Sequence, residues 1–280
     1  MKKKKPVFGK LEKSLLKEIK DKNITQGEMN ALVDQIKHPN MEGKPHKHYW
    51  GQRHSKIALC SDTHIGSKYT RYDVLEDIFK RFKKDGVDAV YLAGDITEGY
   101  NMRAGHTFEC NLHGADAQIK GVVEKIPDIK KPIYFITGDH DYSHYIRQGI
   151  DVGKHIDEGR KDMHYLGMFN ADIELDKNTT IKLMHPAKGT AYALSYHPQK
   201  IIEAFSGGEK PNILAIGHYH KIEQLFYRNI HAFQTGCIQS QSAWMKRMNI
   251  AAMTGAWILD VYTKRNGEID KLESKLLAYY

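Results

Sequence analysis

The stretch that decides the fold is Ile133-Tyr134-Phe135-Ile136-Thr137-Gly138-Asp139-His140-Asp141. Its first half is apolar, β-branched and aromatic, follows Pro132 and ends at a glycine, which predicts a buried strand over 132–137. Its second half places one imidazole and two carboxylates in the following turn. Such groups are costly at the end of a buried strand unless a cation lies beside them, so the pattern indicates a functional site.

The same combination of a strand and a polar turn occurs three more times. Asp62 and His64 follow the run Ile57–Cys60, Asp95 follows Ala89–Gly94, and His218 and His220 follow Ile213–Gly217. Around these runs, strand and helix patterns alternate from Lys56 onward. This order predicts an α/β fold in which helices cover the sheet and ligands gather at the carboxyl ends of the strands.

The expected elements extend to the end of the chain. Helices are predicted at about 71–84, 112–126, 142–160 and 190–206. Strands are predicted at 56–61, 88–93, 132–137, 163–166, 170–176, 179–184, 212–217, 222–227, 230–235, 256–263 and 268–278. Asn266-Gly267 between the last two is a strong hairpin signal.

Residues 1–55 are predicted to form a basic arm, a helical hairpin and a linker, and residues 56–280 the main domain. Apolar residues recur at helical spacing within 11–19 and 29–36. These two helices fit either a degenerate helix-turn-helix or a small hairpin packed on the main domain, and the second reading is favoured. The linker over 38–55 is rich in histidine, and a polar surface loop is a better interpretation than a weak metal site.

Composition describes an ordinary globular protein, with 41% hydrophobic and 27% charged residues. No apolar stretch has the length of a membrane span, and the lysine-rich start lacks the apolar core of a signal peptide. Three widely spaced cysteines indicate buried thiols in a reducing compartment, so we expect a cytoplasmic protein that does not bind membranes.

The net charge of +8 is unevenly distributed. Residues 1–22 hold nine lysines and three acidic residues, a net charge of +6, which leaves +2 for the rest of the chain. A lysine cluster of this kind suits contact with a phosphate backbone without sequence readout. A solvated tail explains it equally well.

The polar residues at the strand ends form one candidate constellation. They are Asp62, His64, Asp95, Asp139, His140, Asp141, His185, His218 and His220. Aspartate and histidine without cysteine suit divalent metals such as manganese, iron or zinc. Two neighbouring metal ions need a shared carboxylate, and Asp95 is central in the order of motifs. Such a pair clamps the attacking and leaving oxygens of a phosphoester.

These motifs resemble, in order, those of the calcineurin-like metallophosphoesterases. The matching pieces are Asp62-Thr63-His64, Gly94-Asp95-Ile96-Thr97-Glu98, Gly138-Asp139-His140-Asp141, His185 and Gly217-His218-Tyr219-His220. Each piece alone is weak, whereas five in fixed order after apolar runs are very specific. His185 is the weakest of them, since a lone histidine is usually a core residue, and its position between two motifs favours a ligand.

The resemblance implies a four-layer αββα sandwich of two mixed β-sheets with a two-metal site, here preceded by a small N-terminal helical segment. It implies that Asp62, His64 and His220 hold the first ion, that Asp95 bridges, and that Asp139, His185 and His218 complete the second site. Manganese is the expected metal, with iron, zinc and nickel as alternatives. A bridging hydroxide would attack phosphorus in line, while His140 assists the leaving oxygen and Asp141 orients its ring.

Asp139 departs from the family, which normally has asparagine there. An aspartate also ligates a metal, but it adds negative charge near an anionic substrate, so we expect retained metal and weaker phosphate binding or catalysis. The departure is either natural tuning or an engineered exchange.

Substrate contacts are predicted in the loop after the second motif, at Arg103, His106 and His113. The run Gln234–Gln241 is expected near the metals, and the Met and Trp residues that follow it are interpreted as packing.

The function favoured by these features is a metal-dependent nuclease or other phosphodiesterase. Thr97-Glu98-Gly99 replaces the Asp-Arg-Gly of the protein-phosphatase branch, which disfavours that branch. The alternative is a phosphatase or pyrophosphatase for a small nucleotide or metabolite. A non-catalytic scaffold, like the metal-free small subunits of some replicative polymerases, is a third hypothesis, disfavoured because nearly all ligands are present. Expected partners are a nucleic acid or nucleotide phosphodiester and, as an open alternative, a second copy of the chain.

Overall fold

The computed structural model describes residues 46–47, 53–187, 189 and 191–280. The chain divides into two units, Met1–Met41 and Glu42–Tyr280, and the description below concerns the second. The predicted basic arm, the two N-terminal helices and most of the predicted linker lie outside the described residues. The boundary at residue 56 therefore stays a prediction.

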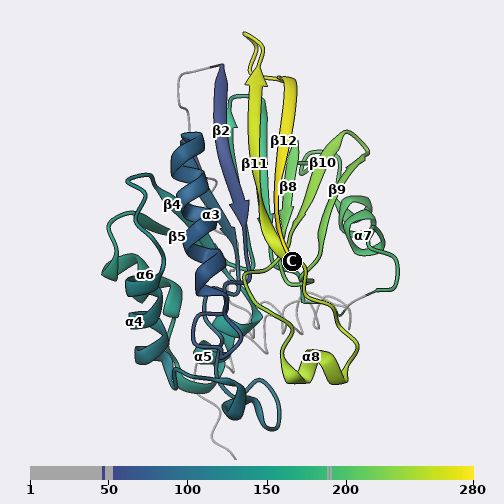
Figure 1. The fold of residues 1–280 in the computed structure, drawn as a ribbon. Coiled ribbons are helices and arrows are strands. Elements are labelled where there is room, and N and C mark those ends of the chain that lie inside the picture. Colours follow the sequence, from purple (N-terminus) through teal and green to yellow (C-terminus); the bar gives the residue numbers. More distant parts are fainter. Residues whose placement is uncertain (1–45, 48–52, 188, 190) are drawn as a thin grey trace, which may run out of the picture. The chain divides into compact units, whose positions relative to one another are not determined.

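Within the described residues, two mixed six-stranded sheets form the centre of the fold (Figure 1). The first has the order β12-β11-β2-β3-β4-β5 and the second β1-β6-β7-β8-β10-β9. The strands are β1 (His46–Lys47), β2 (His54–Cys60), β3 (Ala89–Ala93), β4 (Ile133–Thr137), β5 (Met163–Met168), β6 (Asn170–Asp176), β7 (Thr179–Met184), β8 (Ile213–Ile216), β9 (Ile222–Tyr227), β10 (Ile230–Thr235), β11 (Thr254–Thr263) and β12 (Ile269–Tyr279).

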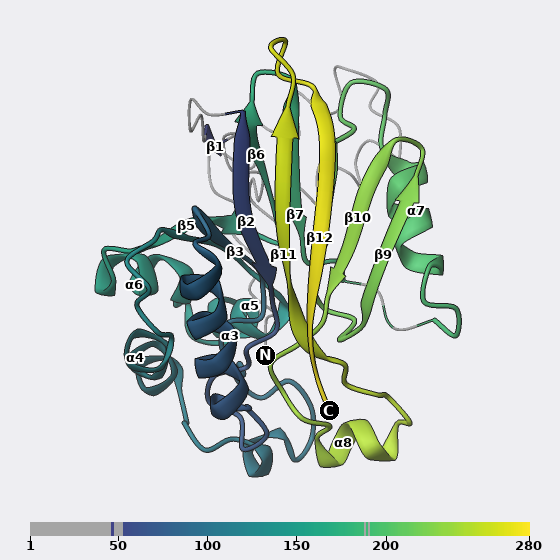
Figure 2. The ribbon, with the colours of Figure 1, turned by 45° about the horizontal axis from the view of Figure 1, so that its top comes forward.

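The helices of the described residues either cover the outer faces of the two sheets or lie in the loops at the ends of the strands. They are α3 (Tyr72–Asp85), η1 (His106–Glu109), α4 (Ala115–Lys125), α5 (Asp139–Gln148), α6 (Val152–Gly159), α7 (Tyr196–Ala204) and α8 (Ala243–Arg247). In α3, apolar residues three and four apart form a buried stripe, and Gly86 ends the helix in a left-handed conformation with φ of 70°. This stripe packs on the first sheet together with residues of α4 and α6, whereas Ile202 of α7 packs on the second. Figure 2 shows α3 and α7 on opposite sides of the sheets.

The alternation of side chains in the strands explains how two cores form. In β2, Ile57 and Leu59 point into the core between the sheets, while Ala58 and Cys60 pack under the helices. The inner core also receives Tyr91, Phe233 and Trp257. The layers are therefore helices, sheet, sheet and helices, and the predicted αββα sandwich of two mixed sheets is confirmed.

The strand register brings the polar turns to one edge of the first sheet. Cys60 pairs with Leu92, and Leu92 pairs with Phe135, all in parallel strands. Asp62, Asp95 and Asp139 follow these three residues by two to four positions, so their turns emerge together.

Three details differ from the sequence prediction. The predicted helix over 142–160 is two helices, because Gly149 with φ of 73° ends α5 in a left-handed turn. The helix predicted at 190–206 is shorter, from Tyr196 to Ala204. Part of the predicted linker belongs to the sheets, since His46–Lys47 pairs with β6 and β2 begins at His54. Among the described helices, none combines the length and apolar character that a membrane crossing requires.

Candidate metal centre

The turns after the strands carry unusual backbone conformations. Five non-glycine residues among the predicted ligands have positive φ: Asp62 (52°), His64 (46°), Asp95 (50°), His218 (75°) and His220 (53°). A left-handed conformation costs an ordinary residue on the order of 1–3 kcal/mol, and it persists where the surrounding structure imposes it. The concentration of this strain at one edge of the sandwich marks the functional site.

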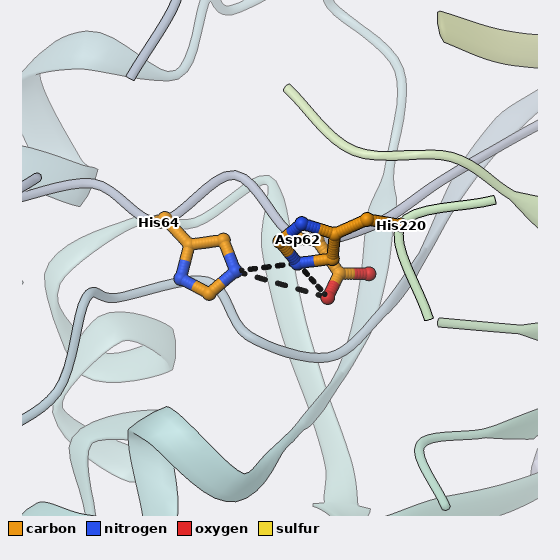
Figure 3. A group of neighbouring side chains, drawn as sticks. All are labelled: Asp62, His64 and His220. Atoms are coloured by element: carbon orange, nitrogen blue, oxygen red, sulfur yellow. Dashed lines mark hydrogen bonds and ion pairs between the residues drawn. The ribbon is translucent and has the colours of Figure 1, made fainter. Parts of the chain in front are cut away.

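The first group of side chains comprises Asp62, His64 and His220 (Figure 3). The Nε2 atom of His220 lies 3.2 Å from Oδ1 of Asp62 and 3.0 Å from Nε2 of His64. The Nε2 atom of His64 is 3.8 Å from the same carboxylate oxygen. Two ring nitrogens and one oxygen thus converge on a common point in a buried place, which is how a metal site is arranged.

The second group comprises Asp95, His185 and His218. The Nδ1 atom of His185 donates to the carbonyl of Ala93 at 2.8 Å. Its Nε2 atom is buried without a hydrogen bond, 3.1 Å from Oδ2 of Asp95. The hydrogen bond fixes the His185 ring in the tautomer that carries its proton on Nδ1, so Nε2 turns its lone pair towards the carboxylate of Asp95. A cation between Nε2 and Oδ2 fits this arrangement.

Asp95 connects the two groups. Its Oδ2 atom is 3.1 Å from Nε2 of His185 and 3.9 Å from Nε2 of His64. Asp139 lies beside the second group, with Oδ2 3.3 Å from Nδ1 of His218. Burial and the negative charge of Asp95 raise the pKa of Asp139 to about 6. This unfavourable crowding of carboxylates is the kind that divalent cations relieve.

Glycines in the motifs let the side chains approach this closely. A Cβ atom on Gly138 would lie 2.3 Å from Oδ1 of Asp95, and one on Gly94 would lie 2.4 Å from Nδ1 of His185. A Cβ atom on Gly217 would lie 2.3 Å from the carbonyl oxygen of Ala93. At Gly94 and Gly138 this space is filled by the candidate ligands themselves. The donor set, its convergence and this close packing all fit a pair of divalent ions.

A cavity of about 390 Å³ opens over the two groups. Its lining includes His64, Asp95, Glu98, His140, His218 and His220. Arg103 also lines it, and its contact with substrate stays a prediction. His106 is 1% exposed and lies behind Glu98, and His113 is exposed outside the lining, so the structure does not bring these two to the cavity.

Comparison with known families agrees with this geometry. The family described as the calcineurin-like phosphoesterase superfamily domain matches residues 56–251, which include both groups of side chains. The chain belongs to the calcineurin-like phosphoesterase superfamily. The predicted metal-dependent phosphoesterase domain is thereby confirmed.

Curated relatives of this phosphoesterase include two small subunits of DNA polymerase II. It is 23% identical over 302 residues to the DNA polymerase II small subunit of Methanothermobacter thermautotrophicus, covering 89% of this chain and 60% of that protein. The DNA polymerase II small subunit of Halobacterium salinarum is 22% identical over 250 residues, with 75% of this chain and 49% of that protein covered. The chain thus spans about half to three fifths of the length of these relatives.

Similar solved structures include an archaeal phosphodiesterase, with 13% identity and a TM-score of 0.45, over 79% of this chain and 99% of that chain. Another is zinc-bound Vps29 from Entamoeba histolytica, with 12% identity and a TM-score of 0.41, over 80% of this chain and 98% of that chain.

Glu98 is a central residue of this phosphoesterase site that sequence reasoning did not select. It is 2% exposed, with Oε2 3.0 Å from Nδ1 of His64 and Oε1 3.1 Å from Nε2 of His106. A carboxylate on the far nitrogen of a candidate ligand orients the ring and raises its basicity. The available signal was its place three residues after Asp95, but a single glutamate in a loop is ordinarily a surface residue.

The contacts of His140 correct one predicted role. Its Nδ1 atom donates to the backbone carbonyl of Glu98 at 2.5 Å, so Glu98 orients the ring. The carboxylate of Asp141 instead accepts hydrogen bonds from the backbone amides of Ile96, Thr97 and Gly138 and from Oγ1 of Thr97. The prediction that Asp141 orients His140 is therefore wrong. Asp141 joins the turn after β3 to the turn after β4.

Replacing Asp141 with alanine is expected to destabilise the protein by about 3 kcal/mol, because it leaves buried amide donors without an acceptor. Urea unfolding followed by circular dichroism measures this loss. The exposed Asp157 of α6 supplies the matched control, whose alanine variant should change stability by less than about 0.5 kcal/mol. Equal unfolding midpoints for the two variants would contradict this role of Asp141.

The residues after the last core strand also correct a prediction. The Met and Trp residues here are predicted to pack, and Met245, which is 4% exposed, does so at the border of the cavity beside Ile250, whereas Trp244 lines the cavity with an exposed ring. Trp244 is 39% exposed and its ring lies 4.5 Å from the guanidinium carbon of Arg103. Apolar residues in α8 fit the pattern of a core, and only the folded chain shows that they face the site.

Proposed function

We propose that this chain is a binuclear metal-dependent phosphodiesterase that cleaves nucleic acid. The observation that carries the proposal is that two Asp/His groups meet at Asp95 on the floor of one cavity, with His140 beside them. Asp62, His64 and His220 would hold one ion, Asp139, His185 and His218 the other, and Asp95 both. Manganese is the metal we expect. When bound, the ions supply Lewis-acid activation of water and neutralise phosphate charge.

His140 is proposed to handle the proton of the leaving oxygen. Because its Nδ1 atom donates to Glu98, the Nε2 atom remains for the substrate. Burial lowers the pKa of His140 to about 4 and so favours the neutral ring. An anionic phosphate beside it favours the protonated form, which can then donate to the leaving oxygen. The Oε2 atom of Glu98, 4.0 Å from Nδ1, supports the same protonation.

Two observations support nucleic acid as the substrate. The first 22 residues carry a net charge of +6, which suits contact with a phosphate backbone. The curated relatives are named as small subunits of a DNA polymerase, which suggests a nucleic-acid context for this chain. The second candidate function is that of a subunit that assembles with a polymerase, with or without catalysis by this chain. The complete set of candidate ligands favours the enzyme.

Hydrolysis assays with added Mn²⁺ test the proposal. The substrates are bis-p-nitrophenyl phosphate, p-nitrophenyl phosphate and labelled single- and double-stranded oligonucleotides, with His220→Ala as the inactive control. Cleavage of the diester and the oligonucleotides by the native chain, and not by His220→Ala, supports a nuclease. Monoester cleavage without oligonucleotide cleavage would replace it with a small-molecule phosphatase. Bound metal without any cleavage would favour the non-catalytic subunit.

Asp139→Asn is expected to raise diester hydrolysis about tenfold or more, because it removes a negative charge that the anionic substrate must approach. The asparagine keeps a carbonyl oxygen for the metal. Steady-state kinetics on bis-p-nitrophenyl phosphate, with metal content measured on the same samples, checks this expectation. A decrease in kcat/KM at equal metal content would show that the carboxylate of Asp139 serves the reaction.

A further inference from the structure

One wall of the cavity is not explained by metal chemistry. It is built by two segments far apart in the sequence, the loop around η1 and the α8 segment. Arg103 comes from the first, and Trp244, Met245 and Ile250 come from the second. Figure 1 shows α8 at the same end of the sheets as α5, which carries His140. This wall therefore faces whatever part of the substrate lies next to the scissile phosphate.

Glu109 fastens the two segments together. One of its carboxylate oxygens, Oε2, pairs with Nη2 of Arg103, and the other, Oε1, accepts the backbone N–H of Trp244 at 2.9 Å. The guanidinium of Arg103 in turn lies over the indole ring, 4.5 Å from its centroid. These three contacts hold the Trp244 ring in place while it remains 39% exposed. An exposed aromatic ring held rigid from two sides has the features of a binding platform.

The charge of Arg103 is already matched by Glu109, so this wall does not offer a free cation for a second phosphate. It offers instead an indole face, a planar guanidinium and the aliphatic side chains of Met245 and Ile250. Planar aromatic groups stack on such surfaces, and any nucleobase can do so because every base has an aromatic face.

The size of the cavity limits how much nucleic acid it takes. Its volume of about 390 Å³ is at the lower end of the roughly 300–1,000 Å³ typical of small-ligand sites. That is room for one nucleotide beside the metal groups. A base within a duplex has both faces covered by its neighbours, so it must leave the stack before it can lie against Trp244.

We propose that Trp244, held by Arg103 and Glu109, stacks on one unpaired nucleobase next to the scissile phosphate. This inference rests on the proposed phosphodiesterase function and adds its substrate class: the site selects a nucleoside phosphodiester whose base is unpaired. Single-stranded or frayed nucleic acid is then cleaved faster than the same sequence in a duplex.

Two chromogenic diesters with the same leaving group provide the test. The p-nitrophenyl ester of thymidine 5′-phosphate carries a base, and methyl p-nitrophenyl phosphate does not. With Mn²⁺ present, the native chain should prefer the thymidine ester in kcat/KM. Trp244→Ala should lower kcat/KM for that ester about tenfold to a hundredfold, the worth of one base–aromatic stack, and leave the methyl ester within about twofold. Trp244→Phe should retain most of the preference.

A binding measurement gives a readout independent of catalysis. Thymidine 5′-phosphate should quench tryptophan fluorescence of the native chain, ribose 5-phosphate should not, and Trp244→Phe should lose the response. Phe226→Ala, which removes an exposed aromatic ring of β9 outside the cavity lining, is the matched control and should behave like the native chain. Thermal unfolding verifies that all variants are folded.

The outcomes separate the two proposals. Hydrolysis of both esters without preference, or an equal loss on both in Trp244→Ala, overturns the stacking platform and leaves the phosphodiesterase intact. Hydrolysis of neither ester by the metal-loaded native chain overturns the phosphodiesterase, and a native chain whose fluorescence thymidine 5′-phosphate does not quench overturns the platform.

Discussion

Replacing Asp95 with asparagine is expected to lower phosphodiester hydrolysis about a thousandfold or more and to weaken metal binding at both groups. Its Oδ2 atom lies 3.1 Å from His185 and 3.9 Å from His64, so one side chain serves both candidate sites. Asparagine has only one oxygen, which is neutral, to serve the two metal sites. Two divalent ions held a few ångströms apart need an anion between them, which the amide does not supply.

Metal analysis and kinetics on the same samples measure this effect. We expect the native chain to bind about two Mn²⁺ ions and Asp95→Asn to lose at least one. Asp172→Asn is the matched control, because Asp172 of β6 is paired with Lys182 of β7 and lies outside the cavity lining. Full metal content and native activity in Asp95→Asn would refute the shared site.

Replacing His140 with glutamine is expected to have the second-largest effect, a loss of about a hundredfold to ten-thousandfold in kcat, the usual contribution of a general acid. His140 lines the cavity, but it is not one of the side chains proposed to hold the two ions. The metal content of His140→Gln should therefore stay at the native value. This combination of lost rate and retained metal distinguishes proton transfer from metal binding.

The leaving group sharpens the test of His140. p-Nitrophenolate departs without much help, whereas the alkoxide of a nucleoside needs a proton. His140→Gln should therefore impair cleavage of an oligonucleotide more than cleavage of bis-p-nitrophenyl phosphate. His113→Gln, on an exposed loop outside the cavity lining, is the control. An equal loss on both substrates would argue against leaving-group assistance.

The chain illustrates which site residues a sequence reveals. Asp62, Asp95 and Asp139 each follow an apolar run after one or two intervening residues, and in a sheet of parallel strands the ends of such runs meet at one edge. Local order along the chain therefore predicts a sheet covered by helices and the convergence of these side chains, whereas the αββα sandwich is implied by the resemblance to the family.

Glu98, Asp141 and Trp244 show where that reasoning stops. Glu98 reaches His64, and Asp141 reaches backbone amides of another turn. Trp244 lines a cavity together with Arg103 and His140, which are more than a hundred residues away in sequence. A glutamate in a loop, an aspartate beside a histidine and an apolar residue in a short helix all have ordinary local explanations. Their roles depend on partners that only folding brings near.

By itself, the sequence determined the order of strands and helices, the position of the site and the chemistry of its donors, because periodicity and residue type act locally. Only the tertiary structure decided which carboxylate orients which imidazole and how Glu109 joins Arg103 to Trp244. The physical reason is that hydrogen bonds and side-chain stacking depend on distances of a few ångströms, and the packing of two sheets and their turns sets those distances.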